Sequence, residues 1–412
     1  AAYKLVSIDA IVQQAIRLGA FPGAQVLVAK EGKVIYQKSF GKHQFDNRQL
    51  VHADDLYDLA SITKIASTTL AMMHLYEQRA FKLNSAIGPY IQCDKKQPIG
   101  KLSFKRLLTH QSGLQANMPI APFIMFEDTT NLACNTYFCK SRKSPTDIQI
   151  ADSMFMTSTW VDSIWQEVYS LKPRRRKRFR YSDVNFNLIQ RFIESHTKMG
   201  LDRFVNQQFY RSLHMQHTAF RPLEKFKAHQ IIPTTDDKKW RKQLLRGYVH
   251  DESAALLGGV GGNSGLFSNT QDLAVLFQML LNGGNYGGKK YLKKSTIDYF
   301  TAARHGNHRG LGFDKPTKTR NRTSSDKASR QTYGHTGFTG TCVWVDPAED
   351  LIFIFLTNRI SPDIHNKKIF KHKVRKRLHN VVYEALNTYE APTDVLLPRE
   401  EVNLERVRAS VE

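Results

Sequence analysis

Ser61 and Lys64 have the spacing that most directly suggests chemistry in this chain of 412 residues. A helical pattern of apolar residues follows the serine: Ile62, Ile65, Ala66, Leu70 and Met73. A lysine three positions after a serine at a helix start lies on the same face of the helix. Unpaired N–H groups and the helix dipole favour negative charge there. The pattern predicts a nucleophilic Ser61 with Lys64 as proton acceptor, provided that burial and nearby cations lower the lysine pKa.

The Ser-x-x-Lys spacing means little alone, because it also begins at Ser39 and Ser324. Ser39 closes a predicted hairpin and Ser324 lies in a polar segment, so neither setting would hold its lysine rigidly. Ser61 also fits a plainer interpretation, in which the serine caps the helix and Lys64 faces solvent.

Residues 181–186 (YSDVNF) form a second candidate element, with Tyr181 and Asp183 two positions apart. A tyrosine hydroxyl near Ser61 can share or relay its proton, and a polar side chain two positions later can hydrogen-bond the lysine or a substrate amide. The same residues also fit a turn that leads into a helix, with Ser182 or Asp183 as the N-cap.

Residues 334–340 (GHTGFTG) run directly into a predicted strand and form the third element. Glycines let a substrate backbone lie close to the strand edge, because no side chain blocks it. The backbone N–H near Phe338 is a candidate oxyanion donor beside that of Ser61, and losing one such donor typically costs about 3–4 kcal/mol of transition-state stabilisation. An ordinary glycine-rich loop before a strand gives the same pattern.

Strand patterns occur near both chain ends, and helical patterns dominate the middle. The terminal elements are helices at residues 8–18 and 368–386 and hairpins at residues 24–36 and 341–356. We therefore expect an α/β (α+β) fold, in which an antiparallel sheet built from both termini is flanked by helices and carries an inserted, mostly helical lobe. An active site would lie in the cleft between the two lobes.

The whole chain, residues 1–412, is expected to form one domain. The predicted parts are a sheet lobe of about residues 1–60 and 240–390, a helical lobe of about residues 61–239, and a tail at residues 391–412. Residues 115–150 and 315–331 have the composition of surface loops.

The net charge of +23, from 60 Lys and Arg against 37 Asp and Glu, favours anionic partners, although it also fits simple solubility. Basic residues gather at residues 174–180 and 367–377. The first run would form a cationic rim near Tyr181 that attracts substrate carboxylates. No nucleic-acid motif accompanies either run, so no nucleic-acid partner is expected, and binding of an anionic polymer is a less favoured alternative.

No run of 18 apolar residues occurs, so no membrane span is expected. The four cysteines, Cys93, Cys134, Cys139 and Cys342, are too few and too irregular for a disulfide framework or a zinc site. Cys134 and Cys139 either pair across a loop or remain thiols. His250, Asp251 and Glu252 stand in a row and cannot converge on one metal ion unaided, so they are expected to form a loop near the cleft.

Together, the three elements resemble the serine β-lactamase-like and penicillin-binding protein superfamily of the class C β-lactamase type, which uses Ser-x-x-Lys, Tyr-x-Asn and Lys/His-Thr-Gly. Residues 107–114 (LLTHQSGL) and 262–268 (GNSGLFS) look like further signatures of that family, and the similarity covers roughly residues 8–390. The catalytic residues that the resemblance implies are Ser61, Lys64, Tyr181, Asp183 and His335. The implied oxyanion and substrate-binding residues are Ser61, Thr336, Gly337 and Phe338. No metal or organic cofactor is implied, and His110 is expected to be structural.

Two positions depart from the β-lactamase pattern: His335 replaces the lysine before Thr-Gly, and Asp183 replaces the asparagine of Tyr-x-Asn. A carboxylate at position 183 could keep Lys64 charged, which would weaken the lysine as a base and leave that role more to Tyr181. His335 is expected to neutralise a substrate carboxylate or to polarise the tyrosine. Both changes argue against a dedicated antibiotic-destroying enzyme.

Residues 181–183 (YSD), 249–252 (VHDE) and 258–260 (GGV) look like the serine-hydrolase modules associated with bacterial family 3 β-N-acetylglucosaminidases. That resemblance implies an acyl-enzyme mechanism on an amide or ester of a cell-wall-derived muropeptide, as in an N-acetylmuramoyl-L-alanine amidase or a D,D-peptidase. It also implies fusion to, or action with, a β-N-acetylglucosaminidase. The implied location is bacterial and periplasmic or exported, with the cytoplasm as the alternative. An esterase of broad specificity and a penicillin-recognising sensor without turnover remain alternative functions.

Overall fold

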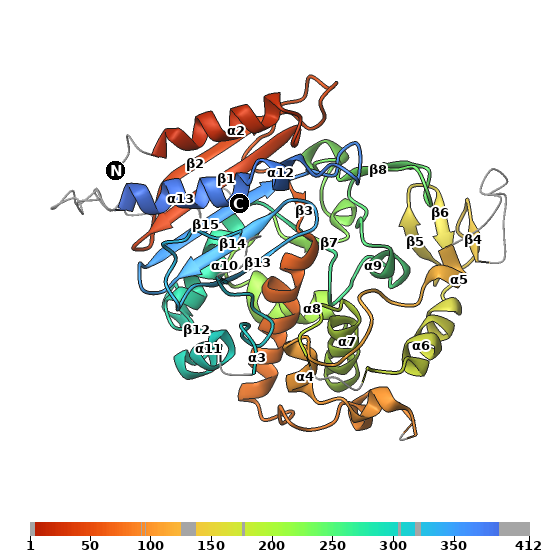
Figure 1. Cartoon of the computed structure of the whole chain (residues 1–412). Helices are drawn as coiled ribbons and strands as arrows, with labels where there is room; N and C mark the ends of the chain where they lie inside the picture. Colours follow the sequence, from red (N-terminus) through yellow and green to blue (C-terminus); the bar gives the residue numbers. More distant parts are fainter. Residues whose placement is uncertain are drawn as a thin grey trace, which may run out of the picture.

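The structure, a computed structural model, describes residues 5–91, 93–94, 96–124, 137–174, 178–303, 306–317 and 323–386. Its centre is a five-stranded antiparallel sheet that combines strands from both ends of the chain (Figure 1). In spatial order the strands are β13 (Tyr333–Thr336), β14 (Cys342–Asp346), β15 (Leu351–Thr357), β1 (Gly23–Lys30) and β2 (Lys33–Gly41). The expected fold class, with an antiparallel sheet flanked by helices, is confirmed.

Two hairpins predicted from the sequence make up most of this sheet. β1 and β2 are joined at Glu31 and Gly32, whose φ angles of 52° and 72° are those that a two-residue hairpin turn requires. Along its other edge β1 pairs with β15, with Ala24 opposite Thr357. The first strand and the last strand of the chain are therefore neighbours.

Helices cover both faces of the sheet, which explains why β15 (LIFIFLT) is apolar along its whole length. Val28 and Phe353 belong to the core on one face, and Leu27 and Ile354 belong to the larger core on the other. The first face is covered by α2 (Ser7–Arg17), α12 (Lys368–Lys371) and α13 (Val374–Leu386), of which α2 and α13 lie side by side (Figure 1). On the second face α10 (Thr270–Leu281) packs against β1 and β15.

The remaining elements surround the larger core (Figure 1). The other helices are α3 (Thr69–Glu77), α4 (Phe104–Leu108), α5 (Ala121–Ile124), α6 (Trp160–Ser170), α7 (Val184–Thr197), α8 (Leu201–Val205), α9 (Glu252–Leu256) and α11 (Lys294–Thr301). Short 3-10 or π turns are η1 (Ala60–Ile62), η2 (Lys64–Thr68), η3 (Gly88–Tyr90), η4 (Pro98–Lys101), η5 (Asn206–Tyr210), η6 (Pro222–Glu224) and η7 (Ala228–Gln230). Two small antiparallel sheets have three strands each: β3 (Tyr57–Asp58), β10 (Leu266–Ser268) and β7 (Ala219–Phe220) form one, and β4 (Phe138–Cys139), β6 (Met154–Met156) and β5 (Ile148–Ala151) form the other. Two more have two strands each: β8 (Thr235–Asp237) with β9 (Gln243–Leu245), and β11 (Asn285–Tyr286) with β12 (Lys289–Lys290).

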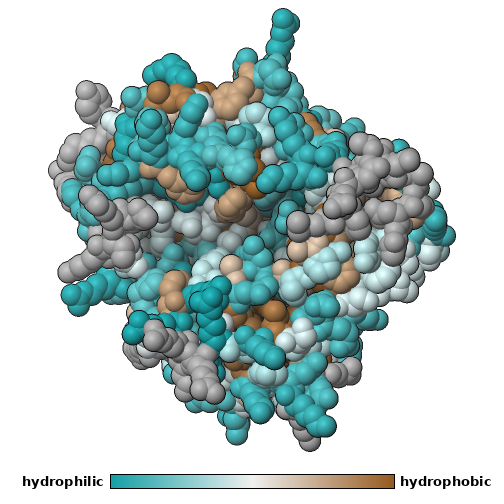
Figure 2. Space-filling model, turned by 45° about the vertical axis from the view of Figure 1, so that its right-hand side comes forward, coloured by the Kyte–Doolittle hydropathy of each residue, from teal (hydrophilic) through white to brown (hydrophobic). Residues whose placement is uncertain are grey.

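Hydrophilic side chains cover most of the molecular face shown in Figure 2, with small hydrophobic areas between them. Among the described helices, none is both long enough and apolar enough to cross a lipid bilayer.

Both segments expected to be surface loops contain ordered or buried structure, so those predictions are wrong in part. Within residues 115–150 lie α5, β4 and most of β5, and β6 completes the β4–β6–β5 sheet. In the second segment Ser324 and Ser325 are buried, and the N–H of Ser325 donates a hydrogen bond of 3.0 Å to Nδ1 of His379. Cys134, and with it the choice between pairing with Cys139 and remaining a thiol, lies outside the described residues, as does the tail at residues 391–412.

His379 on α13 makes the fold sensitive to acid. The ring is buried, with its centroid 4.9 Å from that of Phe353, and burial lowers the pKa of His379 to about 3. An unfolded histidine titrates near pH 6.5, so the unfolded state binds this proton first and stability is lost as the pH falls from about 6.5 toward 3. We expect this group to lower the free energy of unfolding by about 1.4 kcal/mol per pH unit in that window.

Urea unfolding at several pH values between about 7 and 4.5 measures this effect. The variant His379→Gln should show a shallower pH dependence than the wild type, by about one proton. Exposed His214→Gln is the matched control for loss of a histidine. Identical slopes for His379→Gln and the wild type would contradict the assignment.

Candidate active site

Ser61 follows a residue with an unusual backbone conformation. Ala60 has a φ of 48°, which residues with a Cβ rarely adopt, and its N–H donates a hydrogen bond of 2.9 Å to Oδ1 of Asp58. Ser61 lies in the 3-10 turn η1, and Lys64 opens the π turn η2 before α3 begins. The helix predicted after Ser61 thus starts with two irregular turns, and π turns of this kind are frequent at functional sites.

Lys64 is completely buried and contacts the serine directly. Its Nζ lies 2.8 Å from Oγ of Ser61, 2.9 Å from the carbonyl oxygen of Asn263 and 2.6 Å from Oδ1 of Asp183. Asp183 is the residue before α7 and brings its carboxylate to the lysine from the second predicted element. The interpretation in which Lys64 faces solvent is therefore wrong.

Tyr181 reaches the same serine from the loop before α7. Its hydroxyl donates a hydrogen bond of 2.9 Å to Oγ of Ser61, and its ring stacks on that of His110 with centroids 4.4 Å apart. Nδ1 of His110 accepts the N–H of Ser182 at 3.1 Å, which fixes the imidazole behind the tyrosine. Burial lowers the pKa of His110 well below its ordinary value, so a neutral ring supports Tyr181. This geometry agrees with the structural role expected for His110.

Asp183 controls the charge balance around the serine. Burial opposes the charged form of Lys64, but the Asp183 carboxylate and Tyr181 outweigh burial, so the pKa of Lys64 is raised. Burial also raises the pKa of Tyr181. The positive charge of Lys64 opposes this rise, and the Asp183 carboxylate adds to it. Both groups therefore hold their protons in the resting state, and Ser61 needs one of them deprotonated before it can give up its own proton.

The variant Asp183→Asn is expected to move the rising limb of the pH–activity profile to lower pH. Because the Asp183 carboxylate raises the pKa of both Lys64 and Tyr181, its removal lowers both, whichever of the two limits the reaction. Measurement of kcat/KM between about pH 5 and 10 tests this. Asp202→Asn, which removes another ion-paired carboxylate at Arg221, should leave the profile in place. A limb that stays put or moves to higher pH in Asp183→Asn would contradict the account.

His335 and Thr336 lie on β13, at the edge of the central sheet. Nδ1 of His335 lies 2.7 Å from the carbonyl oxygen of Thr336, so this nitrogen donates and carries the ring proton. Burial, together with the Arg309 guanidinium, lowers the pKa of His335 to about 3. The imidazole is therefore neutral in this structure, and its role toward a substrate carboxylate stays a prediction.

Arg309 is a buried cation near His335 and Tyr181, and it is paired with the carboxylate of Asp314. Its side chain is 3% exposed, with Nη1 3.0 Å from Oδ1 of Asp314. Its guanidinium carbon lies 5.9 Å from the centroid of the Tyr181 ring. No spacing in the sequence points to Arg309, because it reaches Tyr181 only through the fold.

The turn after β13 is docked on the segment that carries the nucleophile. A Cβ on Gly337 would lie 2.5 Å from the carbonyl oxygen of Leu59, so only glycine permits this close approach. The hydroxyl of Thr341 donates to the same carbonyl at 3.1 Å, and the hydroxyl of Thr339 donates to the carbonyl of Asp58 at 2.8 Å. These threonines were missed in the sequence, where the glycines around them are the only available signal.

Ser61, Tyr181 and Phe338 line two adjoining cavities, of about 820 and 260 Å³. Lining residues from the predicted set also include His335, Thr336 and Gly337 in the larger cavity and Asp183 in the smaller one. The backbone N–H of Phe338 hydrogen-bonds to no residue in the described part of the chain, which leaves it available to a ligand. The three sequence elements thus meet at one cleft.

We call the basic side chains that line the larger cavity, apart from His335, its cationic wall. They are His308, Arg309, Lys315, Arg359, His365, Lys367 and Arg375, beside a single lining acid, Asp314. The described arginines of residues 174–180, expected to form the cationic rim, do not line this cavity, and residues 175–177 lie outside the described residues. The cationic wall comes instead from segments far away in the sequence.

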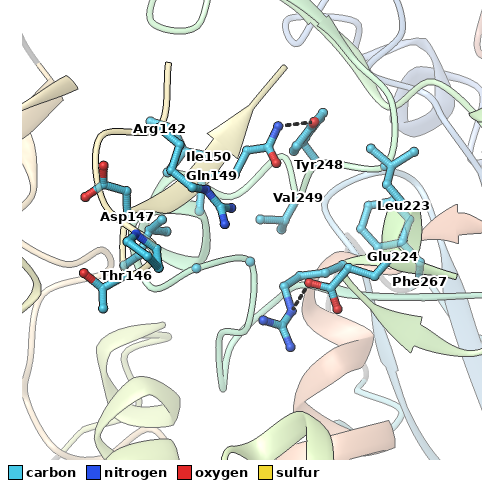
Figure 3. A pocket seen from close by; sticks show the side chains of 17 residues that line it. Arg142, Thr146, Asp147, Gln149, Ile150, Leu223, Glu224, Tyr248, Val249 and Phe267 are labelled. Carbon is cyan, nitrogen blue, oxygen red and sulfur yellow. Dashed lines mark hydrogen bonds and ion pairs between the residues drawn. The ribbon is translucent and has the colours of Figure 1, made fainter. Parts of the chain in front are cut away.

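A separate cavity of about 460 Å³ lies between β5, residues 221–224 and the end of α9 (Figure 3). It shares no lining residue with the two cavities at Ser61. Polar side chains on its wall bond to one another: Arg221 pairs with Glu224 at 3.4 Å, and Gln149 donates to the hydroxyl of Tyr248 at 2.9 Å. None of Ser61, Lys64, Tyr181, Asp183 and His335 lines this cavity.

Residues 250–252 lie at the cleft, as expected, and line its smaller cavity, but Glu252 opens α9 and is not part of a loop. Asp251 caps α9 by accepting the N–H of Ala254 at 2.9 Å, and the ring of His250 stacks on that of Phe338 with centroids 5.5 Å apart. Within the described ranges, no group of three or more His, Cys, Asp or Glu side chains is placed to hold a metal ion.

Comparison with known proteins identifies the family. A family model described as Beta-lactamase matches residues 8–371. Proteins named "Putative D-alanyl-D-alanine carboxypeptidase" from Salmonella gallinarum and Salmonella typhimurium are each 33% identical over 393 residues, which cover 89% of this chain and 85% of each relative. These relatives are bacterial, and their similarity extends over almost the whole chain.

Solved structures share the fold at lower identity. "EstCE1, a hydrolase with promiscuous acyltransferase activity" matches with a TM-score of 0.65 and 17% identity over 92% of this chain and 99% of its own. A class C beta lactamase from Rhodobacter sphaeroides matches with a TM-score of 0.63 and 16% identity over 92% and 99%. The chain therefore belongs to the beta-lactamase family and is a serine hydrolase with neighbours among penicillin-binding proteins and class C β-lactamases.

Proposed function

We propose that this serine hydrolase cleaves an amide bond in a cell-wall-derived peptide through an acyl-enzyme on Ser61. The observation that carries the proposal is the pair of contacts on Oγ of Ser61, from Nζ of Lys64 at 2.8 Å and the hydroxyl of Tyr181 at 2.9 Å. A serine hydroxyl in reach of a base is the arrangement that nucleophilic acyl transfer requires.

The proposed reaction has two stages. Oγ of Ser61 attacks the substrate carbonyl while the Lys64–Tyr181 pair, in its singly deprotonated form, takes the serine proton. The N–H groups of Ser61 and Phe338 stabilise the oxyanion, and the pair then returns the proton to the leaving amine. Water attacks the ester of Ser61, the acid product leaves, and the serine regains its proton.

The cationic wall supports a substrate with a carboxylate near the scissile bond. Arg359 and Lys367 line the cavity beside Ser61, where a terminal carboxylate would find opposite charge. The relatives named as carboxypeptidases support a D,D-carboxypeptidase, which removes a terminal D-alanine that bears such a carboxylate.

The N-acetylmuramoyl-L-alanine bond is the second candidate, and its support is the resemblance of residues 249–252 and 258–260 to modules of cell-wall turnover. Action beside a β-N-acetylglucosaminidase and a periplasmic or exported location belong to the same proposal. Both substrates are amides of peptidoglycan peptides. An assay that offers the two side by side shows which amide is cleaved.

The test offers four substrates to the full chain: a peptide ending in D-Ala-D-Ala, its C-terminal amide, an N-acetylmuramoyl peptide and a nitrophenyl ester. We expect cleavage of one of the two peptidoglycan amides, and at least ~10-fold lower kcat/KM for the amidated peptide if D-alanine is released. Cleavage of the ester alone would favour an esterase of broad specificity. Acylation by penicillin, offered separately, without turnover of any of the four substrates would favour a sensor. Either result would overturn the proposal.

A further inference from the structure

Arg375 on α13 holds the turn that carries the proposed oxyanion donor. Its Nε donates a hydrogen bond of 2.8 Å to the carbonyl oxygen of Gly340, and its Nη2 donates one of 2.9 Å to the carbonyl oxygen of Gly337. The side chain is 5% exposed and comes from a helix on the outer face of the central sheet. In the sequence this arginine belongs to the basic run at residues 367–377.

The carbonyl of Gly337 and the N–H of Phe338 belong to one peptide group. A peptide group is planar, and in its trans form the C=O and N–H point in opposite directions, so a group that fixes the oxygen also aims the N–H. A cation on the oxygen draws electron density through the amide and makes its N–H a stronger donor, as in other polarised hydrogen-bond chains.

We propose that Arg375 is a positioning residue that aims the Gly337–Phe338 peptide and polarises it as an oxyanion donor. The inference rests on the proposed function, since it assigns the arginine to the same acyl transfer at Ser61. Arg375 itself touches neither Ser61 nor Tyr181 through any contact in the described residues.

The lack of a carboxylate partner supports an electrostatic role. Buried arginines are ordinarily paired with an acid, because an unpaired buried charge is expensive. Among the described residues Arg375 forms no ion pair, and its described hydrogen bonds go to the two turn carbonyls. In the described residues no neighbouring anion offsets the positive charge that Arg375 brings to the turn.

The side chain of Phe338 also has stacking partners, although the residue is 49% exposed. The His250 ring lies parallel to it, with an interplanar angle of 6°, and the guanidinium carbon of Arg359 lies 4.7 Å from its centroid. Phe370 continues the stack, 4.9 Å from Arg359 and 5.6 Å from Arg375. The Gly337–Phe338 peptide is thus restrained by Arg375 at its carbonyl oxygen and by ring contacts at the Phe338 side chain.

The test compares Arg375→Met and Arg375→Lys with the wild type, after the wild type has been shown to acylate at Ser61. We expect kcat to fall by about 10–100-fold in Arg375→Met with KM nearly unchanged, which is less than the ~10²–10³-fold that follows loss of a whole donor. Affinity for a boronate that mimics the tetrahedral intermediate should fall by the same factor as kcat/KM. Arg375→Lys keeps the charge and should recover part of the loss.

Vibrational spectroscopy of the acyl-enzyme gives a readout that a merely structural role would not move. A weaker oxyanion donor leaves the acyl carbonyl less polarised, so its stretching frequency should rise in Arg375→Met. Arg377→Gln is the matched control: it removes a positive charge on the same helix, and its guanidinium bonds to Gln14 away from the cleft.

Three results would overturn the inference. An unchanged kcat in Arg375→Met, or a raised KM at constant kcat, would mean that the arginine is only structural or binds substrate. An equal loss in Arg377→Gln would mean that overall charge is responsible. If Arg375→Met does not fold, an Arg375→Lys variant with wild-type kcat, boronate affinity and carbonyl frequency would show that the bridge between the two carbonyls is dispensable. A wild type that is never acylated at Ser61 would instead remove the proposed function on which the inference rests.

Discussion

Replacing Ser61 with alanine is expected to lower kcat by about 10⁴–10⁶-fold while leaving the fold intact. The Ser61 hydroxyl is the proposed nucleophile. Its oxygen lies 2.8 Å from Nζ of Lys64 and 2.9 Å from the hydroxyl of Tyr181, and alanine offers no oxygen to take its place. Alanine removes one oxygen from a small side chain, so the packing around it changes little. Steady-state turnover of the best substrate from the panel measures the effect.

Ser39→Ala is the matched control, because Ser39 begins another Ser-x-x-Lys sequence but lies in β2, away from the cleft. It should keep wild-type kcat. Wild-type rates in Ser61→Ala, with circular dichroism and thermal unfolding unchanged, would show that the nucleophile lies elsewhere.

Tyr181→Phe is expected to have the second largest effect, a loss of about 10²–10⁴-fold in kcat. The variant keeps the ring that stacks on His110 and removes only the hydroxyl that bonds to Ser61. Without that hydroxyl the serine proton depends on Lys64 alone, whose pKa Asp183 keeps raised against the effect of burial. Burst kinetics with a nitrophenyl ester separate acylation from deacylation and should place the loss in acylation.

The control for the tyrosine is Tyr169→Phe, which removes a buried hydroxyl that donates to the carbonyl of Ile91 at 3.2 Å. It should lower thermal stability by an amount similar to Tyr181→Phe but leave kcat unchanged. A loss smaller than about tenfold in Tyr181→Phe would move the base role to Lys64.

The sheet could be predicted because local signals and tertiary structure agree in it. Glu31 and Gly32 mark a two-residue turn, and the apolar run of β15 fits a strand covered on both faces. The helix after Ser61 was predicted in the right place but not in its form, since apolar spacing cannot distinguish the π turn at residues 64–68 from a regular α-helix.

Some residues of the candidate site could be predicted from local spacing, and others could not. Ser61, Lys64, Tyr181 and Asp183 were predicted, because short spacings within two segments place their side chains on turns and helix starts. Arg309 and Arg375 were not, because each approaches the site through the fold alone, from positions more than a hundred residues from Tyr181. Burial also lowers the pKa of His335, and burial is a property of the folded chain that residue type does not give.

Peptide mapping of the protein after reaction with a fluorophosphonate tests the central claim most directly. The account predicts one phosphonyl adduct, on the peptide that contains Ser61, and no adduct in Ser61→Ala. An adduct on a different residue, or substrate turnover that continues with Ser61 unmodified, would contradict it.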